Sequence, residues 1–298
     1  MRTIVEVREV SKRYKDNMAV DRVSFTLEEG KIYGMLGRNG AGKTTIMQLL
    51  TAQAIPSDGE IRLFGEAPYE NARVLGQVCF IKESQKYPDN FKVADALAVA
   101  AMFFPNWDAS YAEALRQQYN LPERRQIKKL SRGMLSAVGI IIGLASRAPL
   151  TIFDEPYLGL DAVARRMFYD QLMADYIEHP RTVVLSTHLI DEVSRLLEHV
   201  LVIDRGRILI NEEAESLRQQ AFAVAGPMNK VETFAQGMKV IQRDPLGALL
   251  TATVLGSLGP EQRHRAEELG LEFAPVSLQE LIVQLTKNQS EGKAAERV

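Results

Sequence analysis

A glycine-rich loop at residues 37–45 constrains this chain more than any other stretch. Its residues are Gly37, Arg38, Asn39, Gly40, Ala41, Gly42, Lys43, Thr44 and Thr45. The apolar run from Ile32 to Leu36 precedes the loop, and Ile46, Leu49 and Leu50 follow it at helical spacing. The loop is therefore predicted to turn the chain from a buried strand into a helix.

Such a turn can bind phosphate. Glycines let consecutive backbone N–H groups point at anionic oxygens, the helix adds the positive end of its dipole, and Lys43 adds an ammonium group. The Thr44 hydroxyl can bind a magnesium ion. The alternative is a turn that binds no ligand. The preceding strand, the loop spacing, the Lys, the Thr and the following helix all match a phosphate-binding loop instead. We therefore predict a nucleoside triphosphate as the ligand.

The composition limits what else the chain can be. Its 298 residues exceed the usual length of one compact domain, which predicts a large domain and a small one. A formal net charge of -2 gives no electrostatic footprint for binding nucleic acid over a wide surface. Because Cys79 is the only cysteine, an intrachain disulfide and a cysteine-based metal site are excluded, which fits a reducing compartment.

No export signal or membrane span is expected. Acidic residues near the N-terminus occupy the place where a signal peptide has its apolar core. The longest apolar stretches, residues 94–104 and 137–145, are shorter than the roughly 20 residues that span a bilayer. We expect this chain alone to be soluble.

Two further buried strands end in polar residues. Leu150 to Phe153 leads into Asp154 and Glu155, and Thr182 to Leu185 leads into a Ser-Thr-His sequence that ends at His188. Adjacent carboxylates are costly to bury without a cation, which indicates magnesium. The alternation of strands and helices predicts a mainly parallel sheet with ligands at the carboxyl ends of its strands.

Helical sequence interrupts this pattern between residues 85 and 122. Phe91, Phe103, Phe104 and Trp107 lie in it, and they either pack an inserted helical subdomain or form a surface for a partner. A long apolar helix is predicted from Met134 to Ser146. Ser131 precedes this helix, where it can cap the N-terminus or help to bind an anion.

Outside the predicted sheet, other segments show weaker patterns. Residues 3–10 and 23–27 are predicted as strands with Tyr14 on the loop between them, and residues 75–81 as another strand. After residue 217 the chain predicts strands at 221–224, 239–243 and 248–254, a turn at 244–247 and a helix at 261–269. Ser277 to Glu280 forms a capping box for a final helix, and residues 288–298 are predicted to be disordered.

The motifs together resemble those of the ATP-binding cassette (ABC) ATPases. Residues 37–44 match the Walker A loop, residues 150–155 the Walker B strand with its glutamate, and residues 130–134 the signature sequence. Gly159 to Asp161 resembles the D-loop, and His188 the switch histidine. The resemblance implies a P-loop α/β fold with a mainly parallel sheet, N-terminal antiparallel strands and an inserted helical subdomain at about 85–146. Residues 1–217 would form this domain, and residues 218–287 a small α+β domain.

The resemblance also implies roles for single residues. Lys43 and the loop amides would hold the phosphates of ATP, and Thr44 and Asp154 would bind Mg²⁺. Glu155 would act as the general base or orient water, His188 would contact the γ-phosphate, and Tyr14 would stack on adenine. In this family the signature sequence closes over the nucleotide of a second subunit. Residues that would take part in these nucleotide contacts are Ser131, Gly133 and Asp161.

Two positions depart from the family pattern. Arg132 replaces the first of two adjacent glycines in the signature sequence, where it could add a cation or crowd the site. In the loop that usually places a Gln near magnesium, Glu83 aligns best and Gln85 is two residues late. We prefer Glu83 as the residue near the metal.

The resemblance implies a biological role. Most chains with a single cassette power a separately encoded membrane permease, and this one looks like the subfamily serving exporters of drugs, antibiotic peptides or lipids. It would form a dimer with a second cassette and lie in the cytoplasm, peripheral on the inner face of the cell membrane, without direct contact to nucleic acid. The alternatives are a soluble ABC ATPase that acts on ribosomes or nucleic acid, and a weakly hydrolysing regulatory cassette.

Overall fold

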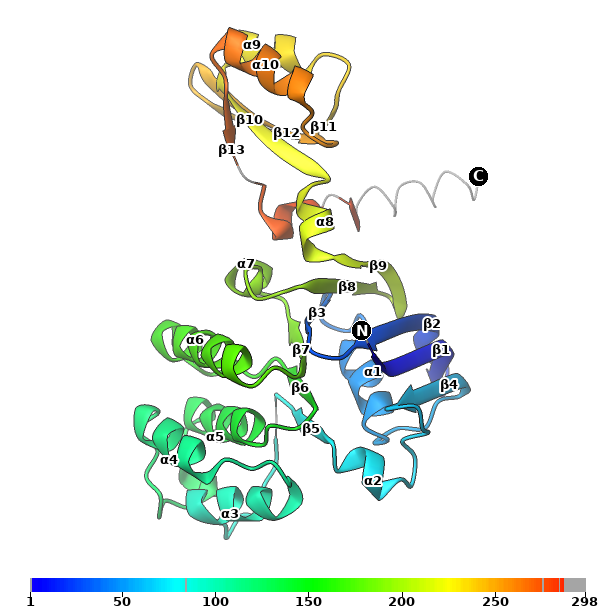
Figure 1. Cartoon of the computed structure of the whole chain (residues 1–298), viewed down its shortest axis with the longest axis vertical. Helices are drawn as coiled ribbons and strands as arrows, with labels where there is room; N and C mark the ends of the chain where they lie inside the picture. Colours follow the sequence, from blue (N-terminus) through cyan, green and yellow to red (C-terminus); the bar gives the residue numbers. More distant parts are fainter. Residues whose placement is uncertain (1, 84, 275, 284, 287–298) are drawn as a thin grey trace. The chain divides into compact units, whose positions relative to one another are not determined.

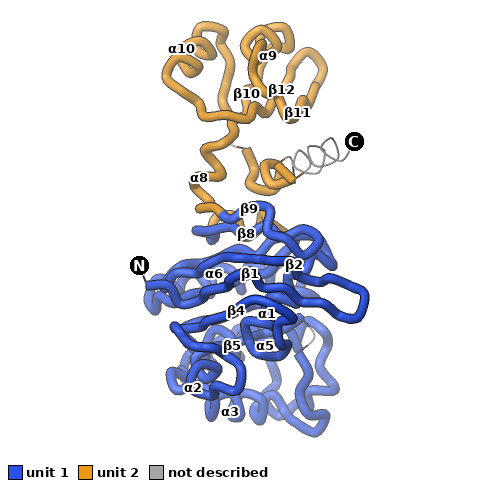
Figure 2. Tube along the Cα trace, turned by 90° about the vertical axis from the view of Figure 1, so that its right-hand side faces the viewer, with its two compact units in different colours: residues 1–188, 196–211 blue, residues 189–195, 212–298 orange. Residues whose placement is uncertain are grey.

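The computed structural model describes residues 2–83, 85–274, 276–283 and 285–286. The chain divides into two compact units (Figure 2). The first contains residues 1–188 and 196–211, and the second contains residues 189–195 and the chain from residue 212 onward. We describe each unit by itself.

A six-stranded sheet is the centre of the first unit (Figure 1). Its strands, in the order β5-β6-β7-β3-β8-β9, are β5 (Val78–Ile81), β6 (Leu150–Asp154), β7 (Thr182–Thr187), β3 (Ile32–Leu36), β8 (His199–Asp204) and β9 (Arg207–Glu213). The first five pair in parallel. Every residue of β3, β6 and β7 is buried, which explains why each of these strands contains a short apolar run in the sequence. The predicted mainly parallel sheet is confirmed.

A three-stranded antiparallel sheet, in the order β2-β1-β4, forms a second layer. Its strands are β1 (Thr3–Tyr14), β2 (Asn17–Glu28) and β4 (Asp58–Leu63). Helix α1 (Lys43–Leu50) packs in one hydrophobic core with residues of this sheet and of the central sheet. The prediction that Tyr14 lies on a loop is wrong, because β1 extends to Tyr14. Shifts of register interrupt the polar second half of β1, so the alternation that marks a strand is lost there.

Helices cover the rest of the central sheet. The helical subdomain contains α3 (Val93–Phe103), α4 (Ala109–Gln118), the 3₁₀ turn Ile127–Lys129 and α5 (Arg132–Ala145). Helices α3 and α4 pack on α5, and α5 packs on β5 and β6. Helix α6 (Ala162–Glu178) follows in this unit, whereas the short α7 (Ile190–Val193) belongs to the second unit. The predicted strand at 75–81 is wrong in its first part, because Asn71 caps a short helix, α2 (Ala72–Leu75).

The second unit has its own four-stranded sheet. After α8 (Ala214–Arg218) the elements are β10 (Ala221–Pro227), α9 (Met228–Ala235), β11 (Lys239–Leu246), β12 (Leu249–Leu255), α10 (Pro260–Leu269) and β13 (Glu272–Ala274). All pairs are antiparallel in the order β11-β12-β10-β13, which is the ferredoxin-like β-α-β-β-α-β arrangement. The predicted turn at 244–247 is wrong, since β11 runs through Leu246. Pro245 is tolerated because β11 is an edge strand.

The last described residues follow the expected pattern. Ser277 Oγ accepts a hydrogen bond from the Glu280 backbone N–H at 3.0 Å, and residues 278–283 are helical. The tail predicted to be disordered, residues 288–298, lies outside the described residues. Among the helices that the structure describes, none is long and apolar enough to cross a membrane.

Candidate functional site

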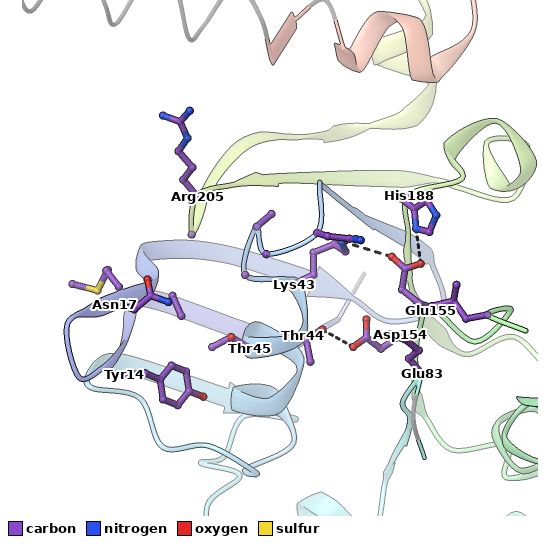
Figure 3. Close-up of a pocket in the computed structure, with 18 residues that line it drawn as sticks. Tyr14, Asn17, Lys43, Thr44, Thr45, Glu83, Asp154, Glu155, His188 and Arg205 are labelled. Carbon is purple, nitrogen blue, oxygen red and sulfur yellow. Dashed lines mark hydrogen bonds and ion pairs between the residues drawn. The ribbon is translucent and has the colours of Figure 1, made fainter. Parts of the chain in front are cut away.

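A cleft of about 770 Å³ lies where the carboxyl ends of the parallel strands meet the loop before α1 (Figure 3). The structure brings most of the predicted site residues to its lining: Tyr14, Asn39, Gly40, Ala41, Gly42, Lys43, Thr44, Thr45, Glu83, Asp154, Glu155 and His188. Arg38 lines an adjoining depression. Gly37 lines neither, but it fixes the turn out of β3. The predicted residues in the lining come from five separate stretches of the chain.

The loop before α1 has the backbone conformation that only glycine adopts easily. Gly42 has a φ of 111°, and a Cβ on it would lie 2.7 Å from the carbonyl oxygen of Ala19. Gly42 is also the N-cap of α1, and neither a capping side chain nor an acidic residue occupies the first turn. The N-terminal N–H groups of α1 therefore have no side chain competing for them, as an anion-binding helix requires. Lys43 is buried, and its Nζ donates to the Gly37 carbonyl at 2.7 Å.

Asp154 lies at the end of β6 beside the first turn of α1. The Thr44 hydroxyl donates to Asp154 Oδ2 at 2.7 Å. The other carboxylate oxygen, Oδ1, is buried and has no hydrogen-bond partner among the described residues. A buried carboxylate oxygen without a partner is costly unless a cation approaches it. A hydroxyl and a carboxylate are oxygen ligands of the kind that Mg²⁺ prefers, so this pair fits that ion.

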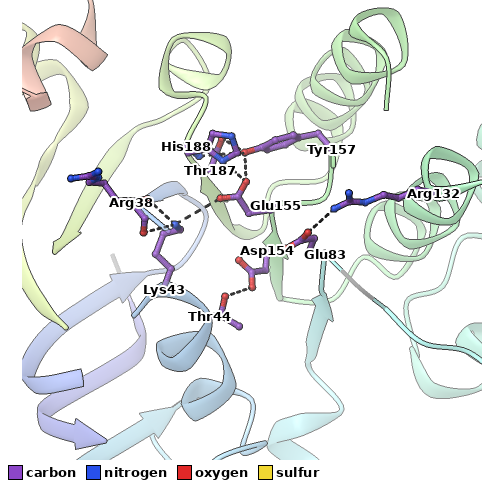
Figure 4. Close-up of polar contacts among 11 residues, drawn as sticks. Arg38, Lys43, Thr44, Glu83, Arg132, Asp154, Glu155, Tyr157, Thr187 and His188 are labelled. Atoms are coloured by element: carbon purple, nitrogen blue, oxygen red, sulfur yellow. Dashed lines mark hydrogen bonds and ion pairs between the residues drawn. The ribbon is translucent and has the colours of Figure 1, made fainter. Parts of the chain in front are cut away.

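Glu155 connects the two sides of the cleft (Figure 4). Its Oε1 lies 3.7 Å from Lys43 Nζ, and its Oε2 lies 2.7 Å from His188 Nδ1. Its φ is +50°, a left-handed conformation that is rare for a residue with a side chain. The carboxylate is buried, whereas the His188 side chain is 43% exposed. The site therefore joins a buried acid to a histidine that solvent and ligands can reach.

Tyr157 belongs to this network and was missed from the sequence. Its hydroxyl lies 2.5 Å from Glu155 Oε2 and 2.8 Å from Thr187 Oγ1, and it accepts a hydrogen bond from the His188 backbone N–H at 3.3 Å. Burial, followed by the hydrogen bond to Glu155, raises the pKa of Tyr157. The only sequence signal for this role was its position two residues after Glu155. An aromatic residue at that position is equally typical of the hydrophobic core.

The rim of the cleft holds other residues that sequence analysis did not select. Asn17 and Met18 lie near Tyr14 at the end formed by the β1–β2 hairpin, and Arg205 comes from the turn between β8 and β9. Tyr14 is 44% exposed, and Lys12 Nζ lies 5.0 Å from the centre of its ring. An exposed aromatic face on the rim is able to stack on a planar ligand.

Ser131, Gly133 and Asp161 do not line the cleft of their own chain. Ser131 Oγ accepts a hydrogen bond from the Met134 N–H at 3.2 Å, so Ser131 caps α5 as predicted. A Cβ on Gly133 would lie 2.5 Å from the carbonyl oxygen of Gly159, which explains the glycine by packing within the chain. Asp161 caps α6 through the Ala164 N–H at 2.8 Å.

The two residues that depart from the family pattern contact each other. Arg132 Nη2 donates to Glu83 Oε1 at 2.7 Å, which joins the first residue of α5 to the loop after β5 (Figure 4). Both side chains are exposed, at 64% for Arg132 and 43% for Glu83. Arg132 therefore extends toward Glu83, a residue of the cleft lining.

Comparison with known proteins gives the family. Residues 20–158 match the family model described as ABC transporter. Over 213 residues the chain is 32% identical to the Nod factor export ATP-binding protein I of Cupriavidus metallidurans, and the match covers 70% of each chain. The chain belongs to the ATP-binding proteins of ABC transporters. As an ABC ATPase it binds ATP, and its hydrolysis of ATP is coupled to transport.

Other relatives of this ABC ATPase agree. It is 29% identical to the bacitracin transport ATP-binding protein BcrA of Bacillus licheniformis, over 70% of this chain and 69% of that one. A solved structure described as the ATP binding subunit of an ABC transporter superposes with a TM-score of 0.66, at 24% identity over 73% of this chain and 93% of that one. The comparison with the solved structure concerns the fold alone, and it confirms the predicted P-loop fold of ABC type.

Proposed function

We propose that this chain hydrolyses ATP to drive a separately encoded membrane permease that exports a drug, an antibiotic peptide or a lipid. The observation that carries the proposal is the cluster of Lys43, Asp154, Glu155 and His188 around one cleft. The names of relatives that serve bacitracin transport and Nod factor export support the exporter class. On this proposal the chain lies in the cytoplasm, peripheral on the inner face of the cell membrane through its permease.

The proposed roles follow from the contacts in the cleft. Lys43 and the free N–H groups of α1 bind the phosphates, because they combine a buried cation with donors that no side chain occupies. Thr44 and Asp154 bind Mg²⁺, which neutralises charge on the phosphates. Glu155 orients the attacking water as general base. His188 contacts the γ-phosphate through Nε2, since its Nδ1 is bonded to Glu155. Tyr14 stacks on adenine, and Glu83 lies near the metal.

A second cassette is part of the proposed site. Ser131, Gly133 and Asp161 belong to motifs that contact nucleotide in this family, yet they do not line the cleft of their own chain. We propose that they face the nucleotide of the second cassette in a head-to-tail dimer with two ATP molecules. Their hydrogen bonds and packing within the chain, which fix the N-termini of α5 and α6, hold them ready for that contact.

We propose the end of α3 as the surface for the permease. Met102 and Phe103 are 84% and 70% exposed there. Phe91, Phe104 and Trp107 are half-buried in the same subdomain. Large apolar side chains exposed side by side are typical of a protein interface. We further propose residues 1–217 as the cassette domain and 218–287 as an accessory domain, which the separate sheet and core of the latter support.

Two measurements test this proposal. Glu155→Gln removes the base while keeping the size of the side chain, so steady-state ATP hydrolysis should fall by at least about 100-fold, within the usual range for such a group. ATP binding should persist. Glu178→Gln, at the exposed end of α6, is the control and should hydrolyse ATP at the normal rate. Normal hydrolysis by Glu155→Gln would remove Glu155 from its role.

The transport partner is tested separately. Affinity purification of the chain from detergent-solubilised membranes should recover an integral membrane protein with several apolar segments of about 20 residues. The same purification from a variant with Met102 and Phe103 replaced by Ser should lose that protein while ATP hydrolysis persists. Recovery of ribosomal proteins without a membrane protein would contradict the permease proposal.

A further inference from the structure

Tyr157 is buried where three chemically important groups meet. Its side chain is 2% exposed, and its ring lies 5.6 Å from the Arg165 guanidinium. Its hydroxyl contacts the Glu155 carboxylate, the Thr187 hydroxyl and the His188 backbone. The hydroxyl thus joins the end of β6 to the end of β7, the two strands that carry Glu155 and His188.

The direction of these hydrogen bonds is fixed by chemistry. An ionised carboxylate only accepts, so the single proton of the Tyr157 hydroxyl is donated to Glu155 Oε2. A backbone N–H only donates, so His188 N–H gives its hydrogen bond to the Tyr157 oxygen. The Thr187 hydroxyl can supply a second donor to the same oxygen. Burial, followed by the hydrogen bond to Glu155, raises the pKa of Tyr157, so its hydroxyl keeps the proton that it donates.

The two oxygens of Glu155 are therefore different. Oε2 is held by Tyr157 and by His188 Nδ1, at 2.5 Å and 2.7 Å. Oε1 is buried, has no hydrogen-bond partner among the described residues and lies 3.7 Å from Lys43 Nζ. Of the two oxygens, Oε1 is the one with capacity left to accept a hydrogen bond from water.

We propose that Tyr157 is a positioning residue for both Glu155 and His188. Its hydroxyl holds Glu155 by Oε2 so that Oε1 orients the attacking water. It also fixes the position of His188 through the hydrogen bond from the His188 backbone N–H. This inference rests on the role of Glu155 in the proposed function. The Tyr157 hydroxyl is not proposed to touch the nucleotide. It acts through Glu155 and His188, the two residues that are proposed to contact the water and the γ-phosphate. Misplacement of a reacting group by a fraction of an ångström lowers rates strongly.

Tyr157→Phe tests the proposal because it removes only the hydroxyl. We expect kcat for ATP hydrolysis to fall about 10- to 100-fold while KM and the affinity for ATP stay within about twofold. The matched control is Tyr33→Phe. Tyr33 is equally buried, and its hydroxyl accepts one hydrogen bond, from the Glu28 N–H at 2.6 Å, away from Glu155 and His188. The control should keep the wild-type kcat, because its hydroxyl does not contact Glu155 or His188.

A second measurement separates positioning from general damage. In single-turnover hydrolysis, Tyr157→Phe should slow Glu155→Gln by a much smaller factor than it slows the wild type, because one of the two groups that Tyr157 positions is already absent. A kcat of Tyr157→Phe within twofold of wild type would overturn the inference, and so would an equal loss in the Glu155→Gln background. If Tyr157→Phe failed to fold, Thr187→Val would take its place with the same two readouts. Normal hydrolysis by Glu155→Gln itself would instead refute the proposed function.

Discussion

A buried ion-pair network joins the helical subdomain to the central sheet, and it gives a prediction of stability. Asp175, on α6, has a side chain that is 2% exposed. Its Oδ2 lies 2.6 Å from Arg181 Nη1, and its Oδ1 lies 3.5 Å from Arg147 Nη2. Arg147 also pairs with Asp108, which caps α4. The network therefore connects α6, the residue before β7, the N-terminus of α4 and the segment that follows α5.

We expect Asp175→Asn to destabilise the first unit by about 3–5 kcal/mol, because it leaves the buried Arg181 charge without its partner. For a folded unit of about 150–250 residues, each kcal/mol lowers Tm by about 2–4 °C, so the expected fall is about 6–20 °C. Asp170→Asn is the control on the same helix. Asp170 and Arg166 are 71% and 85% exposed at 3.8 Å, so the change should stay within about 0.5 kcal/mol.

Thermal and urea unfolding, followed by circular dichroism, measure these differences. The double variant Asp175→Leu, Arg181→Met should recover much of the loss, because removing both buried charges leaves neither uncompensated. A loss by Asp175→Asn no larger than that of Asp170→Asn would refute the reasoning. The reasoning would also be refuted if the double variant lost as much free energy of unfolding as its two single changes together, because the two charges would then act independently.

Three other predictions concern the cleft and the cysteine. Lys43→Ala should weaken ATP binding by at least about 10-fold, since charge-assisted hydrogen bonds contribute about 1.5–3 kcal/mol. Titration with a fluorescent nucleotide measures this, and an unchanged affinity would contradict the role of Lys43 in binding phosphate. Arg132→Gly should change the rate of ATP turnover by less than about fivefold, because an exposed ion pair contributes about 1 kcal/mol at most. A larger gain in turnover would mean that Arg132 slows hydrolysis in the native protein. Burial raises the pKa of Cys79 from 9.0 to about 12, so the native thiol should resist a thiol reagent at pH 8 and react on unfolding. Because the unfolded thiol loses its proton first, the free energy of unfolding should fall as the pH rises from 9.0 towards 12.

The parts of the site carried by local sequence were predictable. Strands β3, β6 and β7 are buried on both faces, so each is a short apolar run, and each ends directly before a site residue. The glycines of the loop before α1 mark a backbone that other residues cannot adopt. In these places the burial, the backbone conformation and the chemistry depend on residues close together in the chain.

The parts that depend on distant residues were not predictable. Tyr157 matters through Thr187 and His188, which are 30 and 31 residues away, and nothing at position 157 alone separates this role from packing. Strand β13 has only three residues and exists because it pairs with β10. Pro245 has the sequence signature of a turn, yet it fits an edge strand whose N–H side needs no partner. In each case a contact between distant segments overrides the local preference.

The two departures from the family pattern are better understood as one feature. On the proposed alignment of Glu83 with the Gln that is usual in the family, a carboxylate at position 83 adds a negative charge to a cleft that already contains Asp154 and Glu155. Such a charge opposes the binding of a triphosphate, whereas the Arg132 guanidinium at 2.7 Å compensates it. A glycine at position 132 offers no side chain for this purpose. The arginine in the signature sequence is therefore explained by the glutamate it accompanies, and replacing both by the usual Gly and Gln should disturb ATP binding less than replacing Arg132 alone.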